Sequence, residues 1–293
     1  MKRRIIFWTC LIAAVVLLLK PIFLDALSSV KQTNVISGYE IEMEAAADEQ
    51  QRILDDAKAY NEKLFELRQH VYFTYQGEEA TDDDYERQLS HGTETMASIS
   101  YPMLGIFLPV VHGTREKDLE YAAGHMYGSS LPVGGPSVHA VIAGHTGLPE
   151  ASLFTPLAKA HEGDKFYIKI MDIKLTYEVD QINVVLPEEE DAYLQIEDGM
   201  DYVTLYTCTP YGINDHRLLV RGRRVYMDDN DDVTESSTMT VEGKNKAAIA
   251  GALTAGLVPI ALIFAGISDC RRYVKVKKND IKKYDIKYRT KVT

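Results

Sequence analysis

The chain has 293 residues, of which 43 are Asp or Glu and 32 are Lys or Arg, so its formal net charge is −11 at pH 7. This length suits one sizeable domain with attached segments, or at most two domains. Because both ends of the chain are basic, the excess negative charge lies in its middle. Repulsion from phosphate then argues against nucleic acid as a partner.

The N-terminal segment, residues 1–24, starts with Met-Lys-Arg-Arg and continues with an uncharged apolar run from Ile5 to Leu19. This pattern is typical of a signal peptide or of a membrane anchor. No small-x-small cleavage site follows closely, and the run is long for a signal peptide. We therefore expect an uncleaved anchor.

A second apolar run covers residues 247–268 and is followed by a basic tail over residues 269–293. The run is uncharged and close to the roughly 20 residues that cross a bilayer as a helix. A buried core helix is the alternative, but the glycine content and the basic flank disfavour it. Because basic residues flank both runs on the side of the termini, the positive-inside rule predicts cytoplasmic termini and an extracytoplasmic middle.

The region between the first run and the first expected strand, residues 25–90, is predicted to be helical and acidic. A stripe of apolar residues at spacings of three and four predicts a helix over residues 40–72. The stripe consists of Ile53, Ala57, Tyr60, Leu64, Leu67 and Val71. An acidic, turn-prone loop over residues 77–84 and a short helical stretch over residues 85–89 follow.

From about residue 97 onward, period-two alternation and β-branched residues predict strands. The expected strands are residues 99–111, 137–143, 165–171, 174–186, 202–207 and 218–226. Short helices fit residues 115–123 and 151–160. Many strands with Gly and Pro turns and few helices predict an all-β barrel or sandwich. Residues 229–246 are acidic and then Ser/Thr-rich, which predicts a linker.

The three cysteines lie in different parts of the chain. Cys10 is inside the first apolar run, Cys270 follows the second, and Cys208 stands alone in the part expected to be exported. Without a partner for an intramolecular disulfide, Cys208 is either an inert buried residue or a reactive thiol. Composition alone leaves both interpretations open.

Cys208 follows the expected strand 202–207, and a Pro- and Gly-containing turn leads into the strand 218–226. Arg217 and Arg221 accompany that returning strand. They are four residues apart and project to the same face, so the pattern does not choose between them. A nucleophilic cysteine needs a base or a positive charge nearby, and an arginine can hold substrate or stabilise an oxyanion.

A histidine is the expected base, and His145 is the leading candidate. It follows the apolar run 138–143 at a strand end, the same kind of position as Cys208, so the two meet if these strands are neighbours. His125 and His216 are rivals, and an ordinary surface or packing histidine is the alternative for each. The sequence contains no CxxC or HExxH pattern, so no metal site is predicted.

Several motifs at coherent spacing resemble the sortase family. Residues 204–208 (TLYTC) resemble the TLxTC signature of that family. The continuation over residues 209–222, together with residues 124–135 and 139–149, is similar to class C, the pilin-polymerising branch. The resemblance covers residues 50–226. A C-terminal membrane span is also common in class C.

The resemblance implies an all-β fold: a closed eight-stranded sortase-type β-barrel with short helices, joined to an N-terminal helix and two transmembrane helices. The barrel would occupy residues 91–228 as the catalytic domain. Residues 25–90 would then hold the position of the class C lid, and residues 229–246 would link the barrel to the second membrane helix.

The resemblance also assigns the site. It implies Cys208 as nucleophile, His145 as acid for the leaving amine and base for the incoming one, and Arg217 as the residue that positions the signal and stabilises the oxyanion. It thereby favours these residues over their rivals. It further implies three substrate-binding residues, Thr207, Leu205 and Ala143. No cofactor is implied.

The implied reaction is attack of Cys208 on the Thr–Gly bond of an LPxTG-like sorting signal, followed by transfer of the acyl group to a Lys amine of another pilin subunit. The implied partners are pilin or surface proteins with such signals, the Lys acceptor and the membrane. Three alternatives remain: attachment of surface proteins to peptidoglycan, a cysteine peptidase that uses water, and a non-catalytic membrane-tethered β-domain with an inert Cys208.

One feature departs from the class C pattern. Class C sortases usually carry a lid with an Asp-Pro-aromatic motif ahead of the barrel, and this chain has no Asp-Pro pair. The corresponding region is about residues 72–84. Either the lid is absent, or Tyr72, Phe73 or Tyr75 takes over its plugging role.

Overall fold

The structure is a computed structural model, and it divides into two compact units, residues 28–246 and residues 1–27 together with 247–293. The residues that it describes are 2–45, 47–67, 83–90, 94–148, 151–226, 257–276 and 278. Helix α1 (Lys2–Ala45) belongs to both units and continues through Pro21.

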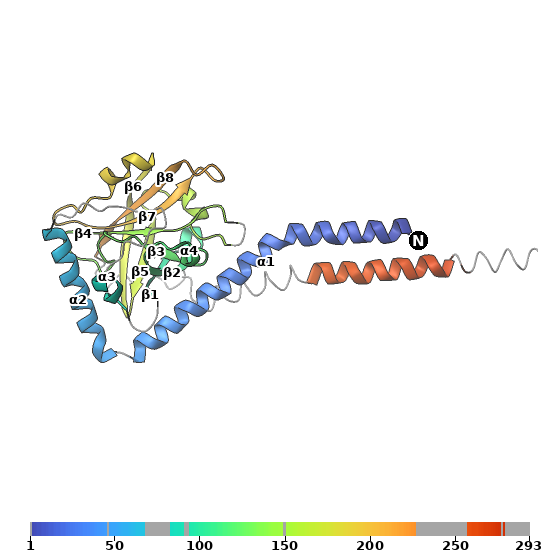
Figure 1. Cartoon of the computed structure of the whole chain (residues 1–293), viewed down its shortest axis with the longest axis horizontal. Helices are drawn as coiled ribbons and strands as arrows, with labels where there is room; N and C mark the ends of the chain where they lie inside the picture. The colour runs from blue at the N-terminus through green and yellow to red at the C-terminus, as the bar shows by residue number, and fades with distance from the viewer. Residues whose placement is uncertain are drawn as a thin grey trace, which may run out of the picture. The chain divides into compact units, whose positions relative to one another are not determined.

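In the described part of residues 28–246, eight strands close into one barrel in the order β1-β2-β3-β4-β7-β8-β6-β5 (Figure 1). The strands are β1 Thr95–Tyr101, β2 Ile106–His112, β3 Ala123–His125, β4 Val138–Ala143, β5 Lys165–Ile170, β6 Ile173–Val185, β7 Asp201–Thr209 and β8 His216–Val225. The predicted closed eight-stranded all-β barrel is thus confirmed. Parallel pairing joins β2 to β3 and β4 to β7, and the other neighbours are antiparallel.

Besides α1, the described residues between 47 and 226 form six helical segments. They are α2 Ala47–Glu66, α3 Asp83–Arg87, α4 Glu116–Leu119 and the 3₁₀ turns η1 Pro102–Leu104, η2 Thr155–Lys159 and η3 Pro187–Tyr193. The helix expected over residues 115–123 ends early because Ala123 already pairs with Val110 as part of β3. This strand has three residues, too few for period-two alternation to reveal.

Helix α2 packs against the barrel through the stripe predicted from the sequence. Ile53, Ala57 and Leu64 are buried, as expected for the apolar face of an amphipathic helix. Leu67 is 56% exposed and follows the last helical residue, Glu66. Residues 68–72 of the predicted helix lie outside the described residues. The lid candidates Tyr72, Phe73 and Tyr75 lie outside the described residues.

The end of α1 contributes to the core of the same unit. Tyr39 is buried, its hydroxyl donates a hydrogen bond to the carbonyl of Met96 at 3.1 Å, and it accepts one from the amide of Met171 at 3.0 Å. The Lys169 ammonium reaches the carboxylate of Glu40 at 2.6 Å. The C-terminal part of α1 is therefore an integral element of the barrel domain.

Two buried apolar clusters lie on opposite faces of the strands that carry the site. The larger cluster fills the barrel and includes Val203 and Leu205 of β7. The smaller cluster lies on the other face of β4, β6, β7 and β8. Its members are Met126, Val141, Ala143, Val185, Leu194, Tyr206 and Leu219. Because side chains alternate along a strand, Cys208 shares the face of Tyr206.

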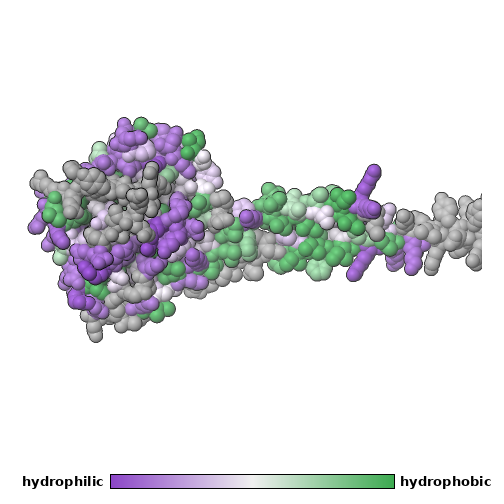
Figure 2. Space-filling model, viewed as in Figure 1, coloured by the Kyte–Doolittle hydropathy of each residue, from purple (hydrophilic) through white to green (hydrophobic). Residues whose placement is uncertain are grey.

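The other unit contains the first part of α1 and a helix over residues 257–276. Among the described residues, one helix is long and apolar enough to cross a membrane: residues 2–42 of α1. Much of the surface of the two helices is hydrophobic (Figure 2). Residues 247–256 of the second predicted span lie outside the described part, so that span stays a prediction.

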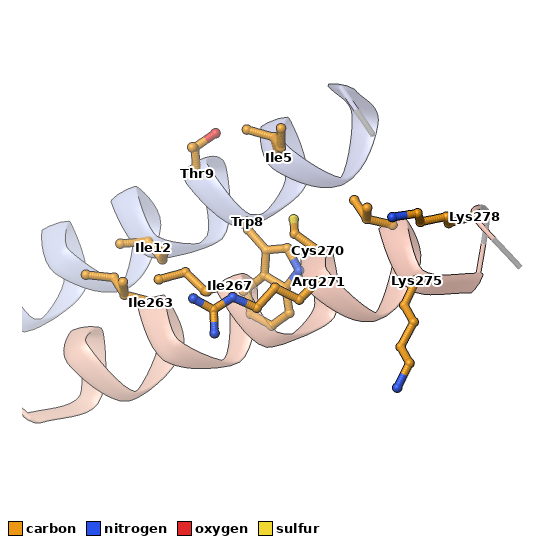
Figure 3. Close-up of a pocket in the computed structure, with 12 residues that line it drawn as sticks. Ile5, Trp8, Thr9, Ile12, Ile263, Ile267, Cys270, Arg271, Lys275 and Lys278 are labelled. Atoms are coloured by element: carbon orange, nitrogen blue, oxygen red, sulfur yellow. The ribbon is translucent and has the colours of Figure 1, made fainter.

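Specific contacts join these two helices. The Asp269 carboxylate accepts hydrogen bonds from Arg4 at 3.0 Å and from the Trp8 indole at 3.2 Å. The Trp8 ring lies across the facing helix (Figure 3), and an added Cβ at Gly266 would approach the ring to 3.2 Å. Glycine thus permits this close approach, as small residues do between membrane helices.

Candidate active site

Strands β7 and β8 bring the predicted nucleophile and an arginine together. Cys208 stands directly opposite Arg217 in their antiparallel register. Residues in such a pair have Cβ atoms roughly 4.5–5.5 Å apart and project to one face. Cys208 is half-buried and forms no disulfide. The thiol of Cys208 and the guanidinium group of Arg217 therefore lie side by side at the end of the sheet where β7 leads into the β7–β8 loop.

The parallel pairing of β4 with β7 brings His145 to the same place. Ala143 is in register with Tyr206, and the amide of Gly144 donates a hydrogen bond to the Tyr206 carbonyl at 3.0 Å. Two residues beyond the paired Ala143 and Tyr206 stand His145 and Cys208. Both strands end at the same edge of the sheet, so the structure brings together the three predicted catalytic residues.

The backbone on either side of His145 is held in place. The Thr207 hydroxyl donates a hydrogen bond to the Gly144 carbonyl at 2.6 Å, and the Phe154 amide donates one to the His145 carbonyl at 3.1 Å. A Cβ at Gly144 would lie 2.7 Å from the buried Phe154 ring. Glycine is therefore required where the chain leaves β4 and turns into the site.

The imidazole of His145 faces a carboxylate from α4. Its Nε2 lies 3.3 Å from the Glu116 carboxylate, whose side chain is 80% exposed. Nε2 is buried and makes no hydrogen bond to a described residue, so this contact has ion-pair distance without hydrogen-bond geometry. A ring nitrogen in this state can take up or release a proton during a reaction.

Arg217 is held by polar groups on the strand face that carries the smaller apolar cluster. Its Nε donates a hydrogen bond to the Tyr206 hydroxyl at 2.8 Å and lies 3.9 Å from the Glu190 carboxylate. Its Nη1 donates to the carbonyls of Asn214 and His216 at 3.2 and 3.1 Å. These contacts fix the guanidinium beside Cys208.

The rival arginine has a different environment. Arg221 donates hydrogen bonds to both carboxylate oxygens of Asp180, at 2.9 and 3.1 Å, and its guanidinium lies 4.1 Å from the centre of the Tyr202 ring. It pairs with Thr204, four residues before Cys208. The geometry therefore favours Arg217, which the residue pattern alone could not select.

The rival histidines are placed differently too. His125 is fully buried, with ring nitrogens 2.9 Å from the Tyr85 hydroxyl and 2.8 Å from the Ser130 carbonyl, and burial lowers its pKa to about 4. His216 pairs with Thr209, and its Nδ1 lies 2.8 Å from a carboxylate oxygen of Asp215. Burial excludes His125 from contact with a substrate.

The three residues expected to bind substrate are buried. Leu205 and Ala143 are 0% exposed and Thr207 is 2% exposed. Leu205 belongs to the interior of the barrel, and Ala143 belongs to the smaller cluster. They offer no side-chain surface to a ligand, so direct substrate contact is not supported; the structure gives Thr207 a supporting role through Gly144.

Two residues that contact the predicted catalytic residues, Glu190 and Glu116, have no signal in the sequence patterns, and the contact of Tyr206 with Arg217 is not apparent there either. Tyr206 occupies the variable position of the TLxTC motif, and period-two alternation places it on the face of Cys208. Glu190 is one of four consecutive acids, residues 188–191. Such a run resembles a solvated loop, and no local pattern distinguishes its one buried member.

Comparison with known proteins identifies the family. A family model of the sortase domain matches residues 99–225. A crystal structure of sortase C-1 from Actinomyces oris is 40% identical and aligns with a TM-score of 0.57 over 61% of this chain and 99% of that chain. The chain belongs to the sortase family. The resemblance inferred from its motifs is confirmed.

Two further relatives place this sortase among known members. The structure of sortase C1 of GBS pilus island 1 is 38% identical, with a TM-score of 0.62 over 67% of this chain and 99% of that one. Sortase A of Streptococcus agalactiae serotype III (strain NEM316) is 34% identical over 125 residues, which are 41% of this chain and 49% of that protein. The chain thus spans about half the length of this curated relative.

Proposed function

We propose that this sortase is a membrane-held cysteine transpeptidase that joins pilin subunits. The observation that carries the proposal is the pairing of Cys208 with Arg217 on adjacent strands, with His145 at the end of the neighbouring strand. A nucleophile, a proton carrier and a cation at one sheet edge are the groups that acyl transfer requires. Similarity to sortases C1, one of them from a pilus island, supports pilin as the substrate class.

In the first half of the reaction, the Cys208 thiolate attacks the carbonyl carbon of Thr in an LPxTG-like sorting signal. A carbon–sulfur bond forms, and negative charge moves to the carbonyl oxygen, where Arg217 stabilises it. The carbon–nitrogen bond to Gly then breaks. The leaving amine takes a proton from the His145 imidazolium, and a thioester remains on Cys208.

In the second half, the side-chain amine of a Lys on another pilin subunit attacks the thioester. His145 accepts the proton that this amine loses, and Cys208 leaves as thiolate. The product is an isopeptide bond between the two subunits. The cycle returns each catalytic group to its starting state and requires no cofactor.

We further propose that α1 anchors the enzyme, with both termini in the cytoplasm and the barrel outside the membrane. The length and apolar composition of α1 support an anchor, and the Lys and Arg residues at both ends of the chain support this orientation. This topology would present Cys208 to substrates on the outer side of the membrane.

Attachment of surface proteins to peptidoglycan is the second candidate function. The absence of an Asp-Pro pair from the sequence favours it, because class C sortases usually carry that pair in their lid. The chemistry at Cys208 would be the same, and only the acceptor amine would differ.

The test uses the full chain in detergent micelles, incubated with an LPxTG-type peptide and analysed by intact mass. The wild type should gain the mass of the acyl fragment, and Cys208→Ala should gain none. A Lys-containing pilin peptide should then release the adduct, whereas release by a cell-wall-type amine alone would favour the anchoring function. A folded wild type in which Cys208 neither acylates nor alkylates would sink the proposal.

A further inference from the structure

A chain of three polar side chains, two of them buried, leads from η3 to the site. The Tyr206 hydroxyl donates a hydrogen bond to the Glu190 carboxylate at 2.7 Å and accepts one from Nε of Arg217 at 2.8 Å. The same carboxylate oxygen of Glu190 lies 3.9 Å from that Nε. Tyr206 therefore connects an acid on one element with the arginine beside Cys208 on another.

The strand register accounts for this arrangement. Tyr206 is two residues before Cys208 and so lies on the same face of β7. It pairs with Leu219, which makes Arg217 its diagonal neighbour on β8, within reach of a long side chain. On the other side, Arg217 pairs with Val185, the last residue of β6, and η3 begins two residues later. Glu190 is thus delivered to the face that carries Arg217.

Burial restrains the hydrogen-bonded connection between Glu190, Tyr206 and Arg217. Tyr206 is 0% exposed and Glu190 is 7% exposed. Burial raises the pKa of the Tyr206 hydroxyl above its ordinary value, and the hydrogen bond to Glu190 raises it further. The hydroxyl therefore stays protonated, so it can donate to Glu190 while it accepts from Arg217. In a buried network of this kind, each bond restrains the geometry of the next.

We propose that Tyr206 and Glu190 are positioning residues that fix the guanidinium of Arg217 where the oxyanion forms beside Cys208. The inference rests on the proposed function, because the oxyanion belongs to that reaction. Arginine has many rotamers, whereas a catalytic group must be held to within about 0.5 Å of its productive position. Tyr206 and Glu190 act on the reaction through Arg217.

The chain supplies a matched control on the same two strands. Tyr202 is buried on the same face of β7, and an arginine of β8, Arg221, stacks over its ring. Carboxylates also hold that arginine, but it pairs with Thr204 and not with Cys208. Tyr202→Phe removes a hydroxyl from an equivalent position that has no connection to the site.

The experiment measures kcat and KM for transfer of an LPxTG-type peptide to an amine, with the full chain in detergent micelles. Tyr206→Phe keeps the ring in the apolar cluster and removes the hydroxyl. We expect kcat to fall roughly tenfold while KM stays within about twofold, because the lost contact acts in the transition state. Tyr202→Phe should match the wild type.

A double-mutant comparison separates positioning from a structural role. If Tyr206 acts through Arg217, then adding Tyr206→Phe to Arg217→Ala should reduce the residual rate no further. Glu190→Gln keeps an acceptor oxygen for the Tyr206 hydroxyl and removes the charge, so its loss of kcat should be smaller, roughly threefold. Thermal unfolding of each variant verifies that it is folded.

Two results would overturn the inference while the proposed function stands: Tyr206→Phe with the kcat of the wild type, or a full additional loss in the Arg217→Ala background. A folded wild type that forms no acyl adduct would instead remove the proposed function, and this inference with it. The three outcomes are distinguishable because the wild-type adduct is measured first.

Discussion

Arg217 and Arg221 are four residues apart on strand β8 and lie on the same face of it. Each lies beside a tyrosine of β7 and an acidic residue from another element. The difference lies in how each is held. Arg221 donates two hydrogen bonds to the carboxylate of Asp180, an arrangement that satisfies its charge within the protein. Arg217 reaches its acid through a neutral hydroxyl, and the Glu190 carboxylate is 3.9 Å away. Because its hydrogen-bond partner is a neutral hydroxyl, the charge of Arg217 is neutralised less within the protein than that of Arg221 and is more available to a substrate.

The largest expected effect comes from removing the arginine at the site. Arg217→Ala should reduce kcat/KM for peptide transfer by roughly 10²–10³-fold, because an oxyanion partner is lost. Arg221→Ala should leave kcat/KM within about twofold of the wild type and lower the thermal stability instead. Equal losses of activity in the two variants would erase the distinction between them.

A pH effect on stability is expected at the Arg221 end. His139 is buried beside Tyr202, with its Nε2 2.8 Å from the Thr204 hydroxyl, and burial lowers its pKa from 6.5 to about 4. Between these two pH values His139 is protonated in the unfolded chain and neutral in the folded chain. Stability should therefore be highest above pH 6.5 and fall towards pH 4, by on the order of 3 kcal/mol for this residue.

This pH effect is measured as the unfolding transition of the full chain between pH 7 and pH 4, followed by tyrosine circular dichroism. His139→Asn should be less stable at pH 7 and show a shallower dependence on pH. His125, whose pKa is also lowered to about 4 by burial, should retain its own contribution in that variant. An unchanged slope in His139→Asn would show that His139 titrates normally.

A smaller loss of activity is expected from the chain next to His145. Gly144→Ala would place a Cβ 2.7 Å from the buried ring of Phe154, so one of the two must shift. Since the Phe154 amide also holds the His145 carbonyl, we expect a loss of roughly tenfold in kcat. Gly163→Ala is a control for the loss of a glycine, because nothing lies within 4 Å of an added Cβ there. Its φ of 88° predicts lower stability with unchanged kcat.

The smallest effect should follow from releasing Arg221. Asp180→Asn removes the charge that binds this arginine, and the partial exposure of the pair limits the expected loss of stability to about 1 kcal/mol. Activity should not change. A drop in kcat with this variant would mean that the two arginine clusters are coupled along β7 and β8.

The sequence allowed the barrel and the family to be predicted and singled out Cys208 as the candidate nucleophile, because each has a local signature. Alternation identifies strands such as β6 and β7, and the strand–turn–strand around Cys208 brings Arg217 back to it. The choice between Arg217 and Arg221 could not be made from alternation, which gives both the same face. It depends on Asp180 and Glu190, which lie on other elements and become neighbours only when the barrel closes.

Helices show the same limit. The sequence predicted an anchor over residues 1–24 and a separate helix over residues 40–72, whereas α1 runs without interruption from Lys2 to Ala45. Pro21, which usually ends or kinks a helix, lies inside it. Packing of Tyr39 in the barrel domain stabilises the later turns of α1. The local sequence of those turns does not predict this long-range packing.

The burial of Tyr39 has a consequence for where α1 can be cut without damage to the barrel domain. A protease that cut α1 upstream of residue 28 would leave the interior of that domain intact. A cut after Ala45 would also remove Tyr39, together with its bonds to Met96 and Met171, and leave a hole in the barrel. Cleavage of α1 is therefore compatible with an intact barrel only close to the apolar run.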